Sequence, residues 1–213
     1  MLIKSEQSRQ KQTHLPCEQL LAHPDFRRLD SVTGIVIDLR YATENNFVGQ
    51  NLYGELDCAW LHKEAAHALQ NAVRWLHLHY PAYRLTVLDA LRPHRIQEIL
   101  WQQLAGTTLQ MYVADPARGS IHSFGLAIDV SLLDEDGELL DMGSDFDAFD
   151  ETSHPALEAE MLQQGRLTME HLAHRKILRE AMLHGGFAGI HSEWWHFNCG
   201  DPELVRQHYI RIM

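Results

Sequence analysis

The feature that most constrains the fold is a carboxylate placed in the middle of a strand pattern, in residues 120–133, SIHSFGLAIDVSLL. Apolar residues alternate with small or polar ones over 126–133, which predicts a β-strand. Its even-numbered positions would face the core, and Asp129 would face the other way, between two small residues that leave room around it. A carboxylate between core positions is costly unless it is paired or bound to a metal; the alternative is an exposed Asp on a half-buried strand.

His122 precedes Asp129 by seven residues, an odd separation that would place the two side chains on opposite faces of one continuous strand. Gly125 lies between them and permits a sharp turn. We therefore expect His122 to lie on a loop above the strand that carries Asp129.

A second group of metal-binding residue types lies in residues 193–198, EWWHFN, whose aromatic composition predicts a strand. Glu193 and His196 would share one face of a helix, but their side chains would diverge on a strand. We expect Glu193 just before regular strand pairing and His196 on the strand, so that one could bind a metal while the other stands beside it. His191 in the preceding loop is a competing ligand, and an aromatic core strand with incidental polar flanks is the alternative.

His122, Asp129 and His196 together have the composition of a catalytic zinc site, with three ligands and an open fourth position. Two neutral imidazoles and one carboxylate leave the centre with a formal charge of about +1, which would acidify a bound water towards a pKa of about 7. Glu193 would accept the proton of this water and deliver it to the leaving amine. The sequence therefore predicts one Zn²⁺ per chain.

The remaining pattern predicts an α+β fold. Strands are expected over 34–43, 84–91, 126–133 and 193–198, helices over 60–79, 93–104 and 155–184, and a long acidic loop over 134–153. This irregular alternation favours a central antiparallel sheet flanked by helices, with the zinc site at the sheet. Residues 1–14 are polar and expected to form a flexible tail, and residues 15–213 to form one domain, because no repeat or linker divides them.

Composition excludes several classes of protein. Of 213 residues, 45% are hydrophobic and 22% charged, as in a soluble globular protein rather than a disordered one. The net charge of −11 disfavours nucleic acid as a partner. The three cysteines are far apart and form neither a disulfide framework nor a CxxC zinc site.

The sequence also lacks the features of a membrane protein. No run approaches the roughly 18 apolar residues of a transmembrane helix, so we expect no membrane partner. The N-terminal residues have no apolar signal region, which predicts a cytoplasmic protein, or a periplasmic one if an export signal has been removed. Nothing in the sequence indicates an oligomeric state.

The two motif segments resemble those of the zinc D-Ala-D-Ala metallopeptidases. SIHSFGLAID and EWWH are similar to the family motifs SxHxxGxAxD and ExxH. DLRYATENNFVGQNLYG (38–54), LDALRP (88–93) and MGSDFDAF (142–149) resemble further family segments in the same order. The resemblance covers about 35–197 and is greatest to the D-alanyl-D-alanine dipeptidase branch known from vancomycin-resistance clusters.

The resemblance implies roles for individual residues. It implies zinc binding by His122, Asp129 and His196, and general-base catalysis by Glu193. It implies that Arg92 polarises the scissile carbonyl and stabilises the oxyanion, and that Asp147 receives the ammonium group of the substrate. Ser120 and Tyr41 match positions that line the small substrate pocket. The family often has Tyr where this chain has Leu91, so the packing beneath Arg92 can differ. The alternatives are an ion pair at a strand end for Arg92, a solvated loop position for Asp147, loop support for Ser120 and packing for Tyr41.

The activity implied by the resemblance is zinc-dependent hydrolysis of a small dipeptide, free D-Ala-D-Ala, to two D-alanines. The nearest alternative is a zinc D,D-carboxypeptidase or endopeptidase that acts on longer peptidoglycan peptides, including the L-Ala-D-Glu type. Asp147 favours the free dipeptide, because a carboxylate there would anchor a free ammonium group and block longer chains. A zinc-binding protein without catalysis is disfavoured, because metal binding alone does not need Glu193.

Overall fold

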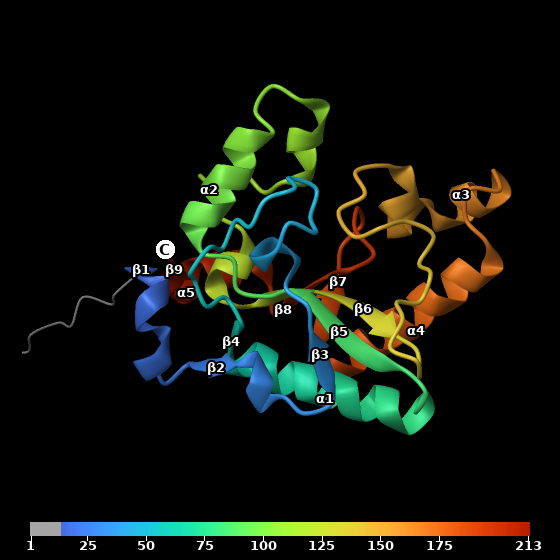
Figure 1. Ribbon diagram of the computed structural model, residues 1–213, viewed down its shortest axis with the longest axis horizontal. Helices are drawn as coiled ribbons and strands as arrows, with labels where there is room; N and C mark the ends of the chain where they lie inside the picture. Colours follow the sequence, from blue (N-terminus) through green and yellow to red (C-terminus); the bar gives the residue numbers. More distant parts are fainter. Residues whose placement is uncertain (1–13) are drawn as a thin grey trace, which may run out of the picture.

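The structure, a computed structural model, describes residues 14–213 (Figure 1). The strands are β1 (His14–Leu15), β2 (Phe26–Arg28), β3 (Ile35–Ile37), β4 (Trp60–His62), β5 (Arg84–Asp89), β6 (Ala127–Leu133), β7 (Phe187–Gly189), β8 (His196–Cys199) and β9 (Arg211–Ile212). The helices are α1 (Lys63–His79), α2 (His94–Gln103), α3 (Glu158–Gln163), α4 (Met169–Gly185) and α5 (Pro202–His208). The expected tail, 1–14, lies outside the described residues except for His14, which begins β1.

A five-stranded sheet in the order β3-β5-β6-β8-β7 forms the centre of the molecule. The predicted α+β class is confirmed, but the prediction of an antiparallel sheet is wrong at one edge, where β3 and β5 run parallel. Parallel neighbours need a long crossover connection, and the chain between β3 and β5 supplies one that contains α1. Outside this sheet, β2 pairs with β4, and β1 pairs with β9, which brings the two ends of the described chain together (Figure 1).

Helices α1 and α4 pack against each other and share one apolar core with the sheet. In Figure 1, α1 runs along the lower side of the sheet. The two helices approach closely where α4 ends, because a Cβ atom on Gly185 would lie 2.6 Å from the carbonyl oxygen of Ala68. None of the helices in the described part of the chain is long and apolar enough to cross a membrane.

Residues 155–184 do not form the single helix that the sequence predicts. Gly165 adopts a φ of 70° after α3, a left-handed conformation that ends the helix. Thr168 then caps α4, because its side chain accepts a hydrogen bond from the backbone N–H of His171 at 3.2 Å. The predicted end is confirmed, since α4 terminates at Gly186 with a φ of 103°.

Two other elements are shorter than predicted. The strand expected over 34–43 is limited to β3 and is followed by a 3₁₀ turn at Arg40–Ala42. The helix expected over 60–79 begins at Lys63, because the three residues before it pair with β2 as strand β4. That pairing joins segments far apart in sequence, so local periodicity does not reveal it. The loop predicted over 134–153 is present, apart from a 3₁₀ turn at its end.

Candidate metal centre and active site

Three polar residues lie side by side on neighbouring strands. The sheet register pairs Asp129 of β6 with Asp89 of β5 on one side and with His196 of β8 on the other. Asp129 is 2% exposed and Asp89 is 0% exposed, so the alternative of an exposed Asp on a half-buried strand is wrong. Two buried carboxylates on adjacent strands require positive charge nearby.

His122 reaches Asp129 through the turn predicted at Gly125. A 3₁₀ helix, η5 (Ile121–Phe124), carries His122 and ends at Gly125, which has a φ of 65°. A Cβ atom at Gly125 would lie 2.8 Å from the backbone nitrogen of His62, so a larger residue would disturb both the turn and its neighbour. The glycine therefore allows a buried histidine to face the strand that follows it.

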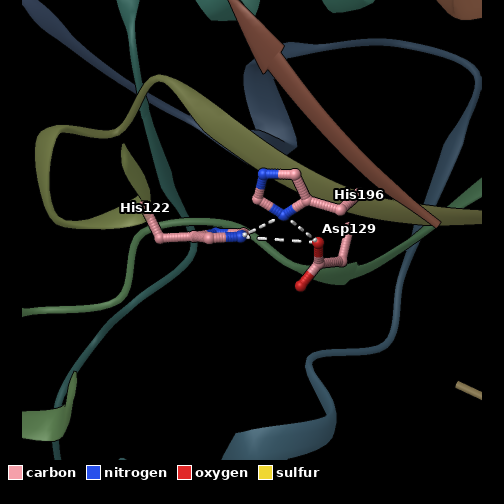
Figure 2. A group of neighbouring side chains, drawn as sticks. All are labelled: His122, Asp129 and His196. Atoms are coloured by element: carbon pink, nitrogen blue, oxygen red, sulfur yellow. Dashed lines mark hydrogen bonds and ion pairs between the residues drawn. The ribbon is translucent and has the colours of Figure 1, made fainter. Parts of the chain in front are cut away.

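His122, Asp129 and His196 bring one atom each to a common point, as Figure 2 shows. His122 Nε2 lies 3.1 Å from His196 Nδ1, and Asp129 Oδ1 lies 3.0 Å from His196 Nδ1 and 3.4 Å from His122 Nε2. Ligands about 2.0–2.1 Å from a tetrahedral zinc would be about 3.3 Å apart. The triangle therefore has the size of one face of a zinc coordination tetrahedron.

The outer hydrogen bonds of the two histidines determine which nitrogen faces this point. His122 Nδ1 donates to the carbonyl oxygen of Ala90 at 2.7 Å, and His196 Nε2 donates to Asn198 Oδ1 at 3.0 Å. The facing nitrogens then carry lone pairs, as does the carboxylate oxygen of Asp129. Three converging acceptors repel one another unless a cation lies between them, so this donor set fits a metal ion.

Glu193 lies beside the triangle and not in it. Its Oε2 atom is 3.9 Å from His196 Nδ1, and it precedes β8, as the sequence predicts. Burial raises the pKa of Glu193 to about 7, a value suited to a general base near neutral pH. His191, the competing ligand, is exposed and is not part of the metal-binding group.

Arg92 lies against the two buried carboxylates on the neighbouring strands, Asp89 and Asp129. Its Nε and Nη2 atoms are 2.9 and 2.7 Å from Asp89 Oδ2, and Nη2 is 3.5 Å from Asp129 Oδ2. Its Nη1 donates to Gln97 Oε1 at 3.2 Å, and its guanidinium carbon lies 4.8 Å from the centre of the Tyr41 ring. Arg92 thus makes an ion pair at a strand end and also faces the space beside the metal triangle.

Asp147 lies in the wall of the space beside the triangle of His122, Asp129 and His196, not in bulk solvent. Its Oδ2 accepts a hydrogen bond from the Tyr41 hydroxyl at 2.9 Å. Burial raises the pKa of Asp147 well above its ordinary value. Its φ of 61° is the one positive value at a non-glycine residue in the described part of the chain. Asp and Asn adopt this conformation more readily than most residues.

Arg175 of α4 fixes the loop that carries Asp147. Its Nε donates to the carbonyl oxygen of Met142 at 2.7 Å, and its Nη2 to that of Thr152 at 2.7 Å. The guanidinium also lies 5.8 Å from the centre of the Trp194 ring, next to Glu193 in sequence. Arg175 is 2% exposed, whereas an arginine in an amphipathic helix pattern suggests a surface position, so no local signal reveals it.

Two other positioning residues, Asp89 and Asn198, were not predicted, although local patterns could have revealed them. Asp89 ends a buried strand three residues before Arg92, a spacing that suggests a pair. Asn198 is two residues after His196, and alternation places both on one face of β8. Each is hydrogen-bonded to a site residue predicted from the sequence.

The predicted site residues line one cavity of about 340 Å³. All eight line it: Tyr41, Arg92, Ser120, His122, Asp129, Asp147, Glu193 and His196. Tyr41 also packs against Tyr53 and Phe146, and the carbonyl of Ser120 accepts from the N–H of Ser123, so packing and loop support accompany their places in the wall. The volume is near the lower end of ligand pockets and suits a small molecule.

Comparisons with known proteins identify the family of this chain. Residues 25–212 match a family model, peptidase M15, described as D-ala-D-ala dipeptidase. The D-alanyl-D-alanine dipeptidase of Escherichia coli (strain K12) is 40% identical over 164 residues, 76% of this chain and 77% of that protein. The one from Enterococcus faecium is 32% identical over 202 residues, 86% and 96% of the two chains. The solved LdcB LD-carboxypeptidase aligns with a TM-score of 0.43 and 16% identity over 75% and 73% of the chains, too distant a likeness to support a conclusion. From the family model and these sequence relatives, the chain belongs to the M15 peptidase family, hydrolases that include the D-Ala-D-Ala dipeptidases.

Proposed function

We propose that this protein is a zinc-dependent dipeptidase that hydrolyses free D-Ala-D-Ala to two D-alanines. The observation that carries the proposal is a metal-sized triangle of acceptors that shares one small cavity with two further carboxylates, Glu193 and Asp147. The relatives named D-alanyl-D-alanine dipeptidase support the same substrate.

His122, Asp129 and His196 would hold the zinc ion, because two nitrogens and one carboxylate oxygen leave a coordination position open for catalysis. When bound, zinc polarises the scissile carbonyl and lowers the pKa of water. The hydrogen bonds that His122 and His196 donate to Ala90 and Asn198 keep both histidines in the tautomer that metal binding requires.

The protein residues carry the proton transfers and stabilise the developing charge. Glu193 accepts a proton from the attacking water and then delivers it to the leaving amine. Arg92 stabilises the negative charge that develops on the carbonyl oxygen, and its contacts with Asp89 and Gln97 keep the guanidinium fixed before the reaction.

Asp147 is proposed to select a free dipeptide. Its carboxylate, hydrogen-bonded to Tyr41, would pair with the ammonium group of the substrate. An acylated amine would bring no positive charge to balance that carboxylate. A carboxypeptidase or endopeptidase acting on longer peptides is the second candidate, and the small cavity disfavours it.

Selectivity for a free N-terminus tests the choice of substrate. Free D-Ala-D-Ala is expected to be cleaved with a kcat/KM about 10- to 100-fold above that of N-acetyl-D-Ala-D-Ala, the range for one charged hydrogen bond. The purified protein would be assayed on both, and on a peptidoglycan pentapeptide. Equal or better turnover of the pentapeptide would favour the second candidate, and no turnover of any of them would contradict both.

Metal content tests the proposed ligands independently of activity. We expect one zinc per chain by elemental analysis, and less than about one-tenth of that in the variant His122→Ala, because two ligands bind zinc far more weakly than three. His77→Ala, at an exposed position of α1, is the matched control and should retain the metal. Unchanged zinc in a folded His122→Ala protein would exclude His122 as a ligand.

A further inference from the structure

We propose that Arg206 of α5, with Arg118 beside it, receives the carboxylate group of the dipeptide substrate. The inference rests on the proposed function and adds a second charged subsite to it. A free dipeptide carries an ammonium group at one end and a carboxylate at the other. Asp147 would bind the ammonium, and the carboxylate needs a partner of opposite charge.

Few positive groups are available in the cavity for this purpose. Among the described residues that line it, the arginines are Arg92, Arg118 and Arg206. The guanidinium of Arg92 already contacts Asp89, Asp129 and Gln97, and the proposed chemistry directs it at the scissile carbonyl. The positive groups that remain available for the substrate carboxylate are therefore the guanidinium groups of Arg118 and Arg206.

The guanidinium of Arg206 is held in place before any ligand binds. Its Nε donates to the carbonyl oxygen of Gly119 at 3.0 Å, directly before Ser120, and its Nη1 donates to that of Pro202 at 3.2 Å. The Arg206 side chain is only 14% exposed. A planar guanidinium already fixed by main-chain contacts loses little conformational freedom when it binds a carboxylate.

The positive charge near Arg206 is incompletely balanced. Glu203 Oε1 is shared, at 2.9 Å from Arg206 Nη1 and 2.6 Å from Arg118 Nη2. One carboxylate thus faces two guanidinium groups. Burial lowers the pKa of Arg206, and the charge of Arg118 lowers it further. A second carboxylate would relieve this repulsion.

The two proposed subsites belong to different elements of the same cavity wall. Asp147 belongs to the loop after β6, whereas α5 packs against η5, which carries His122. In Figure 1, α5 lies to the left of β8 and the loop after β6 lies to its right. A dipeptide with its ammonium at Asp147 and its carboxylate at Arg206 would therefore lie across the cavity that the metal triangle also lines.

The test compares a substrate that has the carboxylate with one that lacks it. Steady-state kinetics of D-Ala-D-Ala and D-Ala-D-alaninamide would be measured for the wild type, Arg206→Gln, Arg206→Lys and Arg27→Gln. The quantity of interest is the ratio of the two kcat/KM values within each protein, because partial unfolding of a variant lowers both values equally. Arg27 is the matched control, since it also donates to main-chain carbonyls, of Pro24 and Phe26, but is exposed and does not line the cavity.

We expect the wild type to prefer the acid over the amide by about 10- to 100-fold, the range for one charged hydrogen bond. Arg206→Gln should remove most of this preference, mainly through a higher KM for the acid. Arg206→Lys should retain part of the preference, and the control Arg27→Gln should keep it in full. A wild type that cleaves both substrates equally, or an Arg206→Gln protein that keeps the wild-type ratio, would overturn the inference. A wild type that cleaves neither would contradict the proposed function itself.

Discussion

Replacement of Glu193 by glutamine is expected to lower kcat on D-Ala-D-Ala by about 10²- to 10⁴-fold while zinc remains bound. The amide has nearly the same size as the carboxylate but cannot accept a proton from water. Glu193 lies beside the triangle of His122, Asp129 and His196, with its Oε2 3.9 Å from His196 Nδ1, so the substitution leaves the three proposed ligands in place.

The measurement pairs kcat with zinc content on the same protein sample. Loss of zinc together with activity would make Glu193 a ligand, and unchanged kcat would exclude it as the general base. Glu180→Gln, on the surface of α4 beside Lys176, is the control for removal of one negative charge and should behave as the wild type.

Substitution of Arg92 by alanine is expected to lower kcat by about 10²- to 10³-fold, the range for loss of one oxyanion donor. A fixed guanidinium stabilises the developing negative charge more than it stabilises the neutral carbonyl, so the effect should appear in kcat. Arg92→Lys should recover part of the activity, because an ammonium keeps the charge but lacks the planar fork that contacts Asp89 and Gln97.

The structure adds a stability effect to the Arg92→Ala prediction. Asp89 is fully buried and would keep Tyr53 as a hydrogen-bond donor but lose its ion pair, so the melting temperature should fall as well. Activity must therefore be expressed per folded, zinc-loaded protein. A variant that melts earlier but turns over D-Ala-D-Ala at the wild-type rate would limit Arg92 to a structural role.

Which residues meet at the candidate site could be predicted, because the motifs that carry them are short and chemically restrictive. Gly125 allows His122 to turn back onto the strand of Asp129, and the aromatic run after Glu193 predicts the strand that carries His196. These are local relations, which a sequence pattern records directly.

Other contacts that hold the site could not be predicted, because they join distant segments. The pairing of β2 with β4 converts the start of a predicted helix into a strand. Arg206 lines the cavity through a contact with Gly119, far from it in sequence. The parallel edge of the sheet likewise depends on where α1 packs, which periodicity within the helix does not specify.

The contacts of Arg175 have a consequence for cooperativity. This guanidinium joins Met142 and Thr152, which lie on either side of Asp147 in its loop, to a helix whose Leu178 and Met182 lie in the main core. Opening the loop would break these hydrogen bonds of a buried guanidinium and leave its longer contact with Glu158, 3.6 Å away, at a cost of several kcal/mol. We therefore expect this wall of the cavity to unfold together with the sheet and α4, and Asp147 to be in position before substrate binds.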